Sequence, residues 1–376
     1  MAGHSIIDGA LVVSLAPMRE VRVDPEQRLA HAGGGALWDD VDAAAFAHGL
    51  AVPGGTFGDT GIGGLTLGGG IGWLMPVAGL TCDNLVEAQV VTADGDVVIA
   101  GPATDPDLLW ALRGGGGNFG IVTRFTYRLR PVELLFGGII RYPAAAARAV
   151  LARVEEVIAG QPNAMLPTLT LQSDPELGSL VKLSFAIVDG ADPGPFVDRL
   201  VRDLPVVAAA TGPLTYLELQ ALAGRMPFGL RNYWKGHGLR TLDPDLFEEI
   251  ARGIGGPDEL GSSFVMFEGI VGAGRMEPEG GAAFGQRAAR WNGSALAIWE
   301  EPGDDVVAIG WARRVAEQLE PWSVSGGGYV NYSPFDEPAE RVQAAYGAER
   351  WERLVVIKRR LDPDNVFRFN HNIDPL

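Results

Sequence analysis

The chain has 376 residues, more than one ordinary hydrophobic core organises, so two domains are expected. Its 47 acidic residues exceed its 30 basic ones, the net charge is −17, and no segment is rich in lysine or arginine. We therefore exclude a nucleic-acid partner, because binding phosphates requires a basic surface. The single cysteine, Cys82, excludes an intramolecular disulfide, and five scattered histidines have no metal-ligand spacing, so no metal is expected.

Targeting signals are not evident in this sequence. No apolar run reaches the roughly 18 residues of a membrane-spanning helix. Residues 1–20 have no basic region, and Asp8 interrupts their apolar stretch, so a signal peptide is not predicted. We expect a cytoplasmic protein without a membrane partner, whose acidic surface favours a neutral or cationic small substrate.

The first 131 residues combine many glycines with short strand-like segments. Asp94-Gly95 is typical of a tight hairpin turn, and Asp105 with Pro106 is a typical helix start. Strands are expected at Ala10–Leu15, Leu85–Ala93, Asp96–Ala100 and Gly120–Leu129, and helices at Asp39–His48 and at DPDLLWALR (105–113).

Beyond Pro131, strand-like and helix-like segments alternate, which predicts an antiparallel or mixed sheet covered by helices, an α+β fold. The expected strands are Phe136–Tyr142, Met165–Gln172, Leu180–Val188 and Ser263–Ile270. The expected helices are Ala144–Ala159, Pro195–Asp203, Pro213–Ala223, Pro244–Arg252, Gly280–Arg290 and the amphipathic Glu337–Leu361, which DPDN (362–365) ends.

Two glycine-rich blocks indicate backbone that approaches a ligand. Residues 53–73 read PGGTFGDTGIGGLTLGGGIGW, and consecutive glycines expose N–H groups that hold phosphates. Residues 113–120 read RGGGGNFG, which formally matches GxGxxG. A helix precedes this block and a strand follows it, the reverse of a Rossmann site, so an NAD site is rejected. The alternative for both blocks is structural: glycine-rich turns in the first and a helix stop in the second.

A third block lies near the C-terminus, as GGGYVNY (326–332) and FRFNHNIDP (367–375). The asparagines in it donate and accept hydrogen bonds together, which suits a heterocyclic amide. Their alternative role is turn formation.

Together these blocks resemble the berberine-bridge-enzyme-like FAD-linked oxidases of the vanillyl-alcohol-oxidase (PCMH-type FAD) superfamily. The similarity is greatest to bacterial members related to 6-hydroxy-D-nicotine oxidase and aclacinomycin oxidoreductase. The matching blocks are LVVSLAPMREVRVDPE, GGGALWDDVD, TGIGGLTLGGGIGWL, LTCDNLVEAQVVTADG, DLLWALRGGGGNFGIVTRF, YVNYSPFDE and AAYGAERWERLVVIKRRLDPDNVFRFNHNI. The resemblance implies a PCMH-type FAD-binding domain at 1–132, a substrate domain with a large antiparallel sheet covered by helices at 133–325, and a segment at 326–376 that returns to the FAD domain.

Two departures from the family pattern concern the attachment of FAD. Members usually carry RxGGH ahead of AGHS, which supplies a histidyl bond to FAD, whereas here Met1 stands directly before AGHS and His4 comes too late for that role. We therefore expect a truncated start. Phe57 stands where bicovalent members carry cysteine, so no cysteinyl link is expected.

The resemblance implies hydride transfer from a small alcohol, amine or sugar-like substrate to FAD, with O₂ as acceptor, in secondary metabolism. It implies Tyr332, and second Tyr329, as the catalytic base; an ordinary tyrosine pKa near 10 would then have to be lowered. Tyr142, Tyr233 and Lys235 are candidates for the substrate side. Asp83 and Asn84 are expected to hold their loop, since Asp and Asn commonly stabilise turns. The residues expected to bind FAD are Thr60, Gly61, Gly63, Gly64, Leu65, Gly69, Gly117, Gly120, Ile121, Asn331, Asn370 and Asn372.

Two alternatives remain open at this point. One is a non-redox cyclase on the same fold that keeps FAD only for structure. The other is a flavin-free remnant or binding protein, which the missing histidine block suggests. Packing against a flavin is the structural alternative for both tyrosines.

Overall fold

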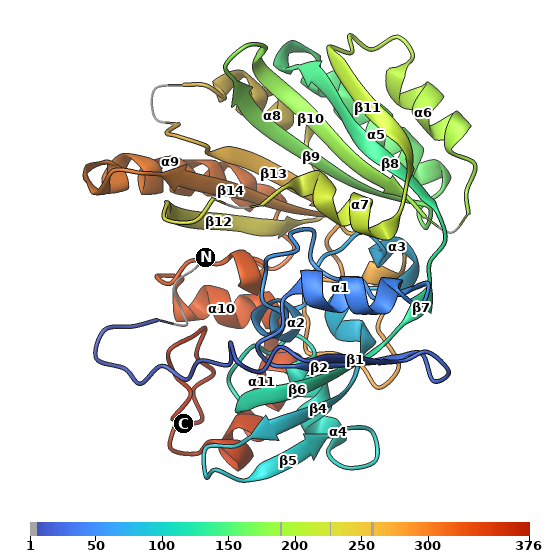
Figure 1. Ribbon diagram of the computed structural model, residues 1–376. Coiled ribbons are helices and arrows are strands. Elements are labelled where there is room, and N and C mark those ends of the chain that lie inside the picture. The colour runs from blue at the N-terminus through green and yellow to red at the C-terminus, as the bar shows by residue number, and fades with distance from the viewer. Residues whose placement is uncertain (1–5, 189, 226, 257–258) are drawn as a thin grey trace.

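The computed structural model describes residues 6–188, 190–225, 227–256 and 259–376, so His4 lies outside the described residues. Figure 1 shows a large sheet stacked above a smaller body that contains a second sheet, with the C-terminal end of the chain beside the lower body. The polypeptide runs through the lower body, then the upper sheet, and returns to the lower body at its end.

In the lower body, the described residues form an antiparallel sheet of five strands in the order β1-β2-β6-β4-β5. These are β1 Val21–Asp24, β2 Leu29–Gly33, β6 Ile121–Arg128, β4 Leu85–Val91 and β5 Val97–Ala100. The expected hairpin at Asp94-Gly95 is present, with Gly95 at φ +85°. Around the sheet lie α1 Trp38–Phe46, α2 Ile62–Gly68, α3 Met75–Ala78, α4 Pro106–Leu112 and the small pair β3 Leu50–Ala51 and β7 Arg130–Pro131.

The upper sheet has seven strands among the described residues, in the order β11-β8-β10-β9-β13-β14-β12, and every neighbouring pair is antiparallel. This confirms the α+β class with a large antiparallel sheet. The strands are β8 Leu135–Pro143, β9 Met165–Asp174, β10 Gly178–Ile187, β11 Ala208–Leu214, β12 Arg231–Leu239, β13 Phe264–Gly269 and β14 Trp291–Trp299. Strands β11, β12 and β14 are not among those predicted from the sequence.

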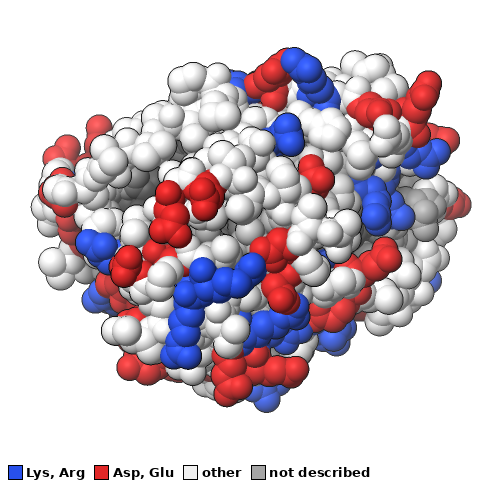
Figure 2. Space-filling view, turned by 90° about the horizontal axis from the view of Figure 1, so that it is seen from below, with Lys and Arg blue, Asp and Glu red and all other residues white. Residues whose placement is uncertain are grey.

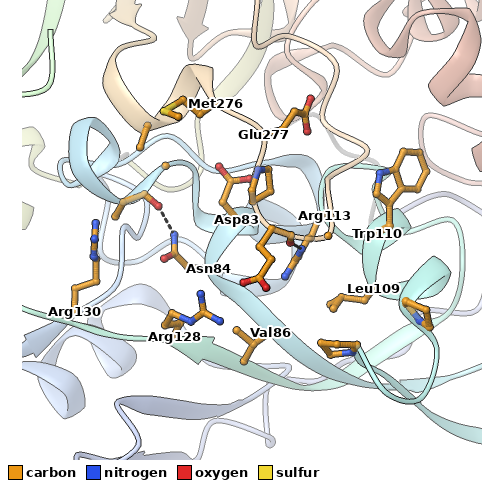
Figure 3. Close-up of a pocket in the computed structure, with 18 of the residues that line it drawn as sticks. Asp83, Asn84, Val86, Leu109, Trp110, Arg113, Arg128, Arg130, Met276 and Glu277 are labelled. Atoms are coloured by element: carbon orange, nitrogen blue, oxygen red, sulfur yellow. Dashed lines mark hydrogen bonds between the residues drawn. The ribbon is translucent and has the colours of Figure 1, made fainter.

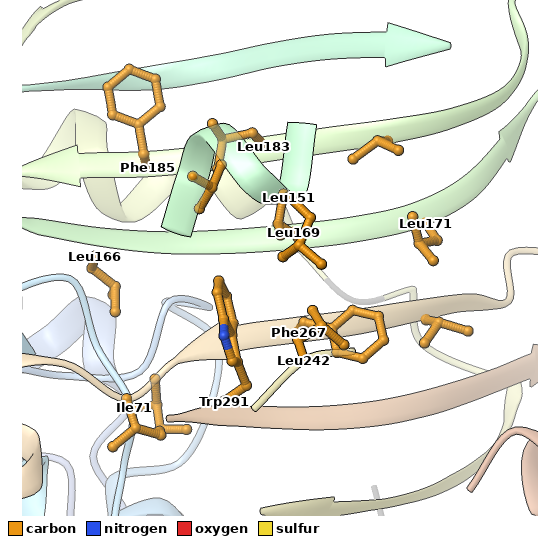
Figure 4. Close-up of a cluster of buried hydrophobic side chains, with 14 of the residues drawn as sticks. Ile71, Leu151, Leu166, Leu169, Leu171, Leu183, Phe185, Leu242, Phe267 and Trp291 are labelled. Carbon is orange, nitrogen blue, oxygen red and sulfur yellow. The ribbon is translucent and has the colours of Figure 1, made fainter. Parts of the chain in front are cut away.

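One face of the upper sheet is covered by helices and forms the larger core. Leu169, Leu183 and Phe267 point to this face and pack with Leu151 of α5 (Figure 4). Because side chains alternate along a strand, their neighbours Thr170, Lys182 and Glu268 point to the opposite face, which is turned toward the lower body. The helices associated with this sheet are α5 Ala147–Gly160, α6 Pro193–Val201, α8 Pro244–Gly253, α9 Asp305–Leu319 and the short α7 Tyr216–Gln220.

The C-terminal helices pack on the lower core rather than the upper one. Val342 and Leu354 belong to the same buried cluster as Trp38 and Phe125. The expected single helix is two, α10 Ala339–Tyr346 and α11 Ala348–Leu361, because Gly347 at φ +78° interrupts the helical backbone. Short 3₁₀ turns complete the chain, at η1 Thr81–Asn84, η2 Ala144–Ala146, η3 Ala221–Ala223, η4 Gly272–Arg275, η5 Pro302–Asp304, η6 Glu320–Trp322 and η7 Val330–Tyr332.

Three expected elements are wrong. Ala10–Leu15 is not a strand: no neighbouring strand pairs with it, and Leu11 is 92% exposed. Gly280–Arg290 is not a helix, because its backbone bonds the end of α4, with Ala283 N donating to Trp110 O. Pro213–Ala223 begins within strand β11 and becomes helical only from Tyr216.

Acidic and basic side chains alternate over the face of the lower body in Figure 2. Ion pairs of the lower body include Arg360–Asp105 and Arg353–Asp107, which join α11 to the start of α4. Among the described residues, no helix is both long and apolar enough to span a bilayer.

Candidate functional site

A cavity of about 480 Å³ lies where the glycine blocks meet the C-terminal segments. This size is within the roughly 300–1,000 Å³ that is usual for small-molecule and cofactor sites. Trp234 of β12 reaches it from the upper sheet. Its lining residues are Gly55, Thr56, Phe57, Thr60, Gly61, Gly64, Leu65, Leu67, Gly68, Ile71, Gly116, Gly117, Asn118, Trp234, Tyr329, Val330, Asn331, Tyr332, Tyr346, Asn370 and His371.

The glycines of the first block fall into two kinds. A Cβ added at Gly61 or Gly64 would meet no atom within 4 Å, so the backbone is open to the cavity there. A Cβ at Gly68 would instead lie 2.0 Å from Asn331 Oδ1, and one at Gly70, which has φ +93°, would lie 2.2 Å from Thr81 Oγ1. The first kind leaves room for a ligand, and the second lets segments of the protein pack closely.

Tyr329 holds the glycine block against the C-terminal segment. Its hydroxyl oxygen accepts from Gly70 N at 2.7 Å and from Asn331 Nδ2 at 2.8 Å. Asn331 Nδ2 also donates to Leu65 O at 2.9 Å. Burial raises the pKa of Tyr329, so the phenol stays protonated. Tyr329 is thus suited to positioning the cavity wall and unsuited to acting as a base.

A buried carboxyl group lies beside the cavity. The hydroxyl of Tyr332 donates to Glu268 Oε1 at 3.2 Å, and Asn292 Nδ2 donates to Glu268 Oε2 at 2.9 Å. Burial raises the pKa of Glu268 to about 7, partly offset by these two hydrogen bonds. Burial and the nearby Glu268 raise the pKa of Tyr332, the opposite of what a tyrosinate base needs. The group poised to accept a proton at neutral pH is Glu268.

Sequence reasoning missed Glu268, Asn292 and Trp234. Glu268 lies within an apolar strand, FVMFEG, and an acidic residue flanked by apolar strand residues was the available signal. Trp234 lies between Tyr233 and Lys235 on β12, and strand alternation turns it to the face opposite both.

Several polar atoms around the cavity lack a protein partner. The side-chain oxygens Asn370 Oδ1 and Asn372 Oδ1 are buried and accept no hydrogen bond from the described residues. Asn118 Nδ2 is engaged, donating to Gly115 O at 3.0 Å, and Asn118 Oδ1 accepts from Ile373 N at 3.1 Å. Unpaired buried acceptors beside open glycine backbone fit a polar heterocyclic ligand with N–H groups.

The structure brings together most of the residues expected to bind FAD. Thr60, Gly61, Gly64, Leu65, Gly117, Asn331 and Asn370 line the cavity, as do Tyr329 and Tyr332. Gly63, Gly69, Gly120, Ile121 and Asn372 are not among its lining residues. A Cβ at Gly120 would lie 2.6 Å from Val91 O, so this glycine permits close packing on β4.

The three expected substrate residues lie elsewhere, on the helix-covered face of the upper sheet. Tyr142 donates to Leu200 O at 2.8 Å within the core. Tyr233 donates to Asp336 Oδ1 at 3.1 Å, and Lys235 pairs with Glu337 at 2.5 Å. Strand alternation is the reason: Trp234 points to the cavity, so its neighbours point away from it.

A larger cavity of about 760 Å³ lies on another side of the lower body (Figure 3). Several of its polar groups bond the protein itself. Arg113 donates to Leu85 O and Glu279 O, and Asn84 Nδ2 donates to Ala78 O at 2.8 Å. Asp83 forms an ion pair with Arg287 at 2.5 Å, so Asp83 and Asn84 brace loops, in keeping with their expected role.

Comparison with known proteins gives the family. The sequence model of the FAD binding domain matches residues 1–101, and that described as "Berberine and berberine like" matches residues 328–374. (R)-6-hydroxynicotine oxidase of Paenarthrobacter nicotinovorans is 31% identical over 389 residues, covering 99% of this chain and 83% of that protein. The chain belongs to the berberine-like family of FAD-linked oxidoreductases.

An FAD-linked oxidoreductase of Dictyostelium discoideum is 28% identical over 99% of this chain and 81% of its own length. Among solved structures, 6-hydroxy-D-nicotine oxidase from Arthrobacter nicotinovorans superposes with a TM-score of 0.88 at 29% identity, over 100% of this chain and 84% of that one. Aclacinomycin oxidoreductase, at 24% identity, shares the fold with a TM-score of 0.83 over 97% of this chain and 85% of that one. This chain is therefore an FAD-dependent oxidase, and the open glycines and the unpaired Asn370 Oδ1 of the 480 Å³ cavity fit that cofactor.

Proposed function

We propose that this oxidoreductase oxidises a C–H bond next to the hydroxyl or amino group of a small organic molecule, with O₂ as the final acceptor. The observation that carries this proposal is the hydrogen bond between Tyr332, which lines the cavity, and the buried Glu268. FAD, when bound, supplies the acceptor for the hydride. The protein supplies the position of the substrate and the group that takes its proton.

The proton path follows from the exposure of the two residues. Glu268 is 3% exposed and is not a lining residue, whereas Tyr332 lines the cavity. In our proposal the donor O–H or N–H gives its proton to the Tyr332 oxygen as the Tyr332 hydroxyl passes its own to Glu268. This relay needs no free tyrosinate, so the raised pKa of Tyr332 does not oppose it.

We further infer which parts of the chain bind the cofactor and which bind the substrate. Residues 1–132 and 326–376 would hold the cofactor, and 133–325 would supply the substrate side. In support, the glycine blocks, Asn331 and Asn370 come from the first group, whereas Trp234 and Glu268 come from the second. FAD would contact the cavity residues Thr60, Gly61, Gly64, Leu65 and Gly117. Its polar partners would be Asn331, Asn370 and Asn372.

Anaerobic flavin reduction tests the proposal. FAD-loaded protein would be mixed with a panel of small alcohols, amines and sugars while flavin absorbance is followed, and air would then be admitted. Bleaching by a panel member and recovery in air with peroxide release support the oxidation. A cyclase would instead be supported if the protein binds these compounds tightly and converts one of them to an isomer while the flavin absorbance never bleaches.

A further inference from the structure

Two cationic side chains lie side by side on the face of the upper sheet that is turned toward the lower body. Lys182 of β10 is the direct cross-strand partner of Arg141 of β8 on one side and of Thr170 of β9 on the other. Thr170 pairs in turn with Met266 of β13, and Met266 with Ser294 of β14. Directly paired residues of antiparallel strands share a face, so these five side chains form one row across the sheet.

The two cations have no acidic partner. Most other lysines and arginines in the described residues form ion pairs, but neither Lys182 nor Arg141 has a carboxylate or other acceptor within bonding distance. Asp174 acts on Arg141 only from farther away, since its carboxylate accepts from Glu176 N and Leu177 N in the turn. Like charges placed directly opposite each other destabilise a sheet, so this pair needs another explanation.

Burial makes the arrangement less favourable still. Burial, and then the charge of Arg141, lower the pKa of Lys182. Further along the row, Ser294 Oγ is buried and has no hydrogen-bond partner among the described residues. The row therefore presents two cations and an unpaired hydroxyl with no anion to neutralise them, which is the complement of an anionic ligand.

The row lies close to the proposed reaction centre. Glu268 is two residues from Met266 along β13 and points to the same face. Ordinary strand spacings put the Cα atoms of Glu268 and Lys182 roughly 12 Å apart. Met266 belongs to an apolar cluster with Leu296 and Trp234, against which Tyr332 packs. Leu296 and Trp234 lie on β14 and β12, on the side of β13 away from Lys182.

We propose that Lys182 and Arg141 bind an anionic group of the substrate, a carboxylate or a group of like charge, while its oxidisable carbon lies at Tyr332. This deepens the proposed function and rests on it. The substrate class is then a small organic acid with an alcohol or amine at its far end. It reverses the expectation from net charge, because the local field of two adjacent, partly buried cations outweighs a distant acidic surface.

Calorimetric titration of the FAD-loaded protein with phenylbutyrate and with its uncharged amide tests the anchor. A charge-assisted contact predicts that the carboxylate binds roughly tenfold to a hundredfold more tightly than the amide. Lys182→Met should abolish this preference, Arg141→Met should reduce it, and Lys182→Arg should keep most of it. Arg202→Gln, an exposed cation on the same domain, serves as the matched control and should leave it unchanged.

Equal affinity for the two probes in the unchanged protein would overturn the proposal. So would a preference that survives Lys182→Met in a variant whose unfolding temperature matches that of Lys182→Arg. Flavin bleaching by hydroxyl-bearing acids, read in the same samples, separates the two proposals. If the protein prefers the carboxylate over the amide but its flavin does not bleach, the result supports anion binding by Lys182 and Arg141 and counts against the proposed oxidation.

Discussion

The hydroxyl of Tyr332, in the 3₁₀ turn η7, lies 3.2 Å from Oε1 of Glu268, a residue 64 positions earlier on strand β13. We expect Glu268→Gln to slow flavin reduction by roughly 10²–10⁴-fold, because a positioned general base contributes that much. In the unchanged enzyme the rate should rise with pH through about 7, as Glu268 loses its proton. The rise should vanish in the variant. Stopped-flow measurement of flavin reduction at a series of pH values gives both the rate and its pH dependence.

Tyr332→Phe should slow the same step and flatten its pH-dependent rise, because the buried Glu268 then has no link to the cavity. Tyr233→Phe is the matched control, since that phenol lies on the opposite face of the sheet. A Tyr332→Phe enzyme with unaltered reduction rates would rule out the relay.

Two neighbouring glycines should respond oppositely to alanine. Gly64→Ala adds a methyl group that meets no atom within 4 Å, so the fold should persist while flavin affinity falls. Gly70→Ala forces φ +93° on alanine and drives its Cβ toward Thr81, so it should lower the unfolding temperature. Thermal unfolding together with flavin absorbance distinguishes these effects. Equal destabilisation by both substitutions would contradict the assignment of Gly64 to the cavity wall.

Removing the Tyr329 hydroxyl should affect stability more than proton transfer. Tyr329→Phe leaves the Gly70 N–H without its acceptor and deprives Asn331 Nδ2 of one of its two acceptors. A cost of about 1–3 kcal/mol in the free energy of unfolding is expected for such a loss. Denaturant titration gives this value. The shape of the pH profile of flavin reduction should not change, and a change would show that Tyr329 takes part in the chemistry.

Asp42 links α1 of the lower body to α7 under the upper sheet. Gln220 Nε2 donates to its carboxyl at 2.7 Å, and burial raises the pKa of Asp42 from 3.8 to about 8. The native state thus keeps a proton that the unfolded chain releases, so stability should fall as pH rises from about 4 to 8. Asp42→Asn should flatten this part of the melting-temperature profile. Glu26→Gln, at an exposed position, should leave it intact, and an unchanged slope in Asp42→Asn would exclude Asp42 as its source.

Local chemistry in the sequence determined several elements directly. Asp105 caps α4 by accepting from Leu108 N, and Asp94-Gly95 makes the expected hairpin, because both depend on neighbouring backbone alone. The glycine blocks also indicated the cofactor, since a backbone that must meet a ligand closely leaves few other residue types possible. The family resemblance then supplied the antiparallel sheet and FAD, which the comparisons confirm.

Other features of the fold and the site were decided only by the tertiary structure, because they depend on pairing between segments that are distant in the sequence. Ala10–Leu15 has the composition of a strand but no neighbouring strand to bond it. Tyr233 and Lys235 flank Trp234, and the alternation of β12 turns them to the helix-covered face while Trp234 reaches the cavity. The contact of Glu268 with Tyr332, and the juxtaposition of Lys182 with Arg141, exist only because strand register brings them together. A sequence fixes which side chains are available, whereas register and burial decide which of them share a face and what charge they carry.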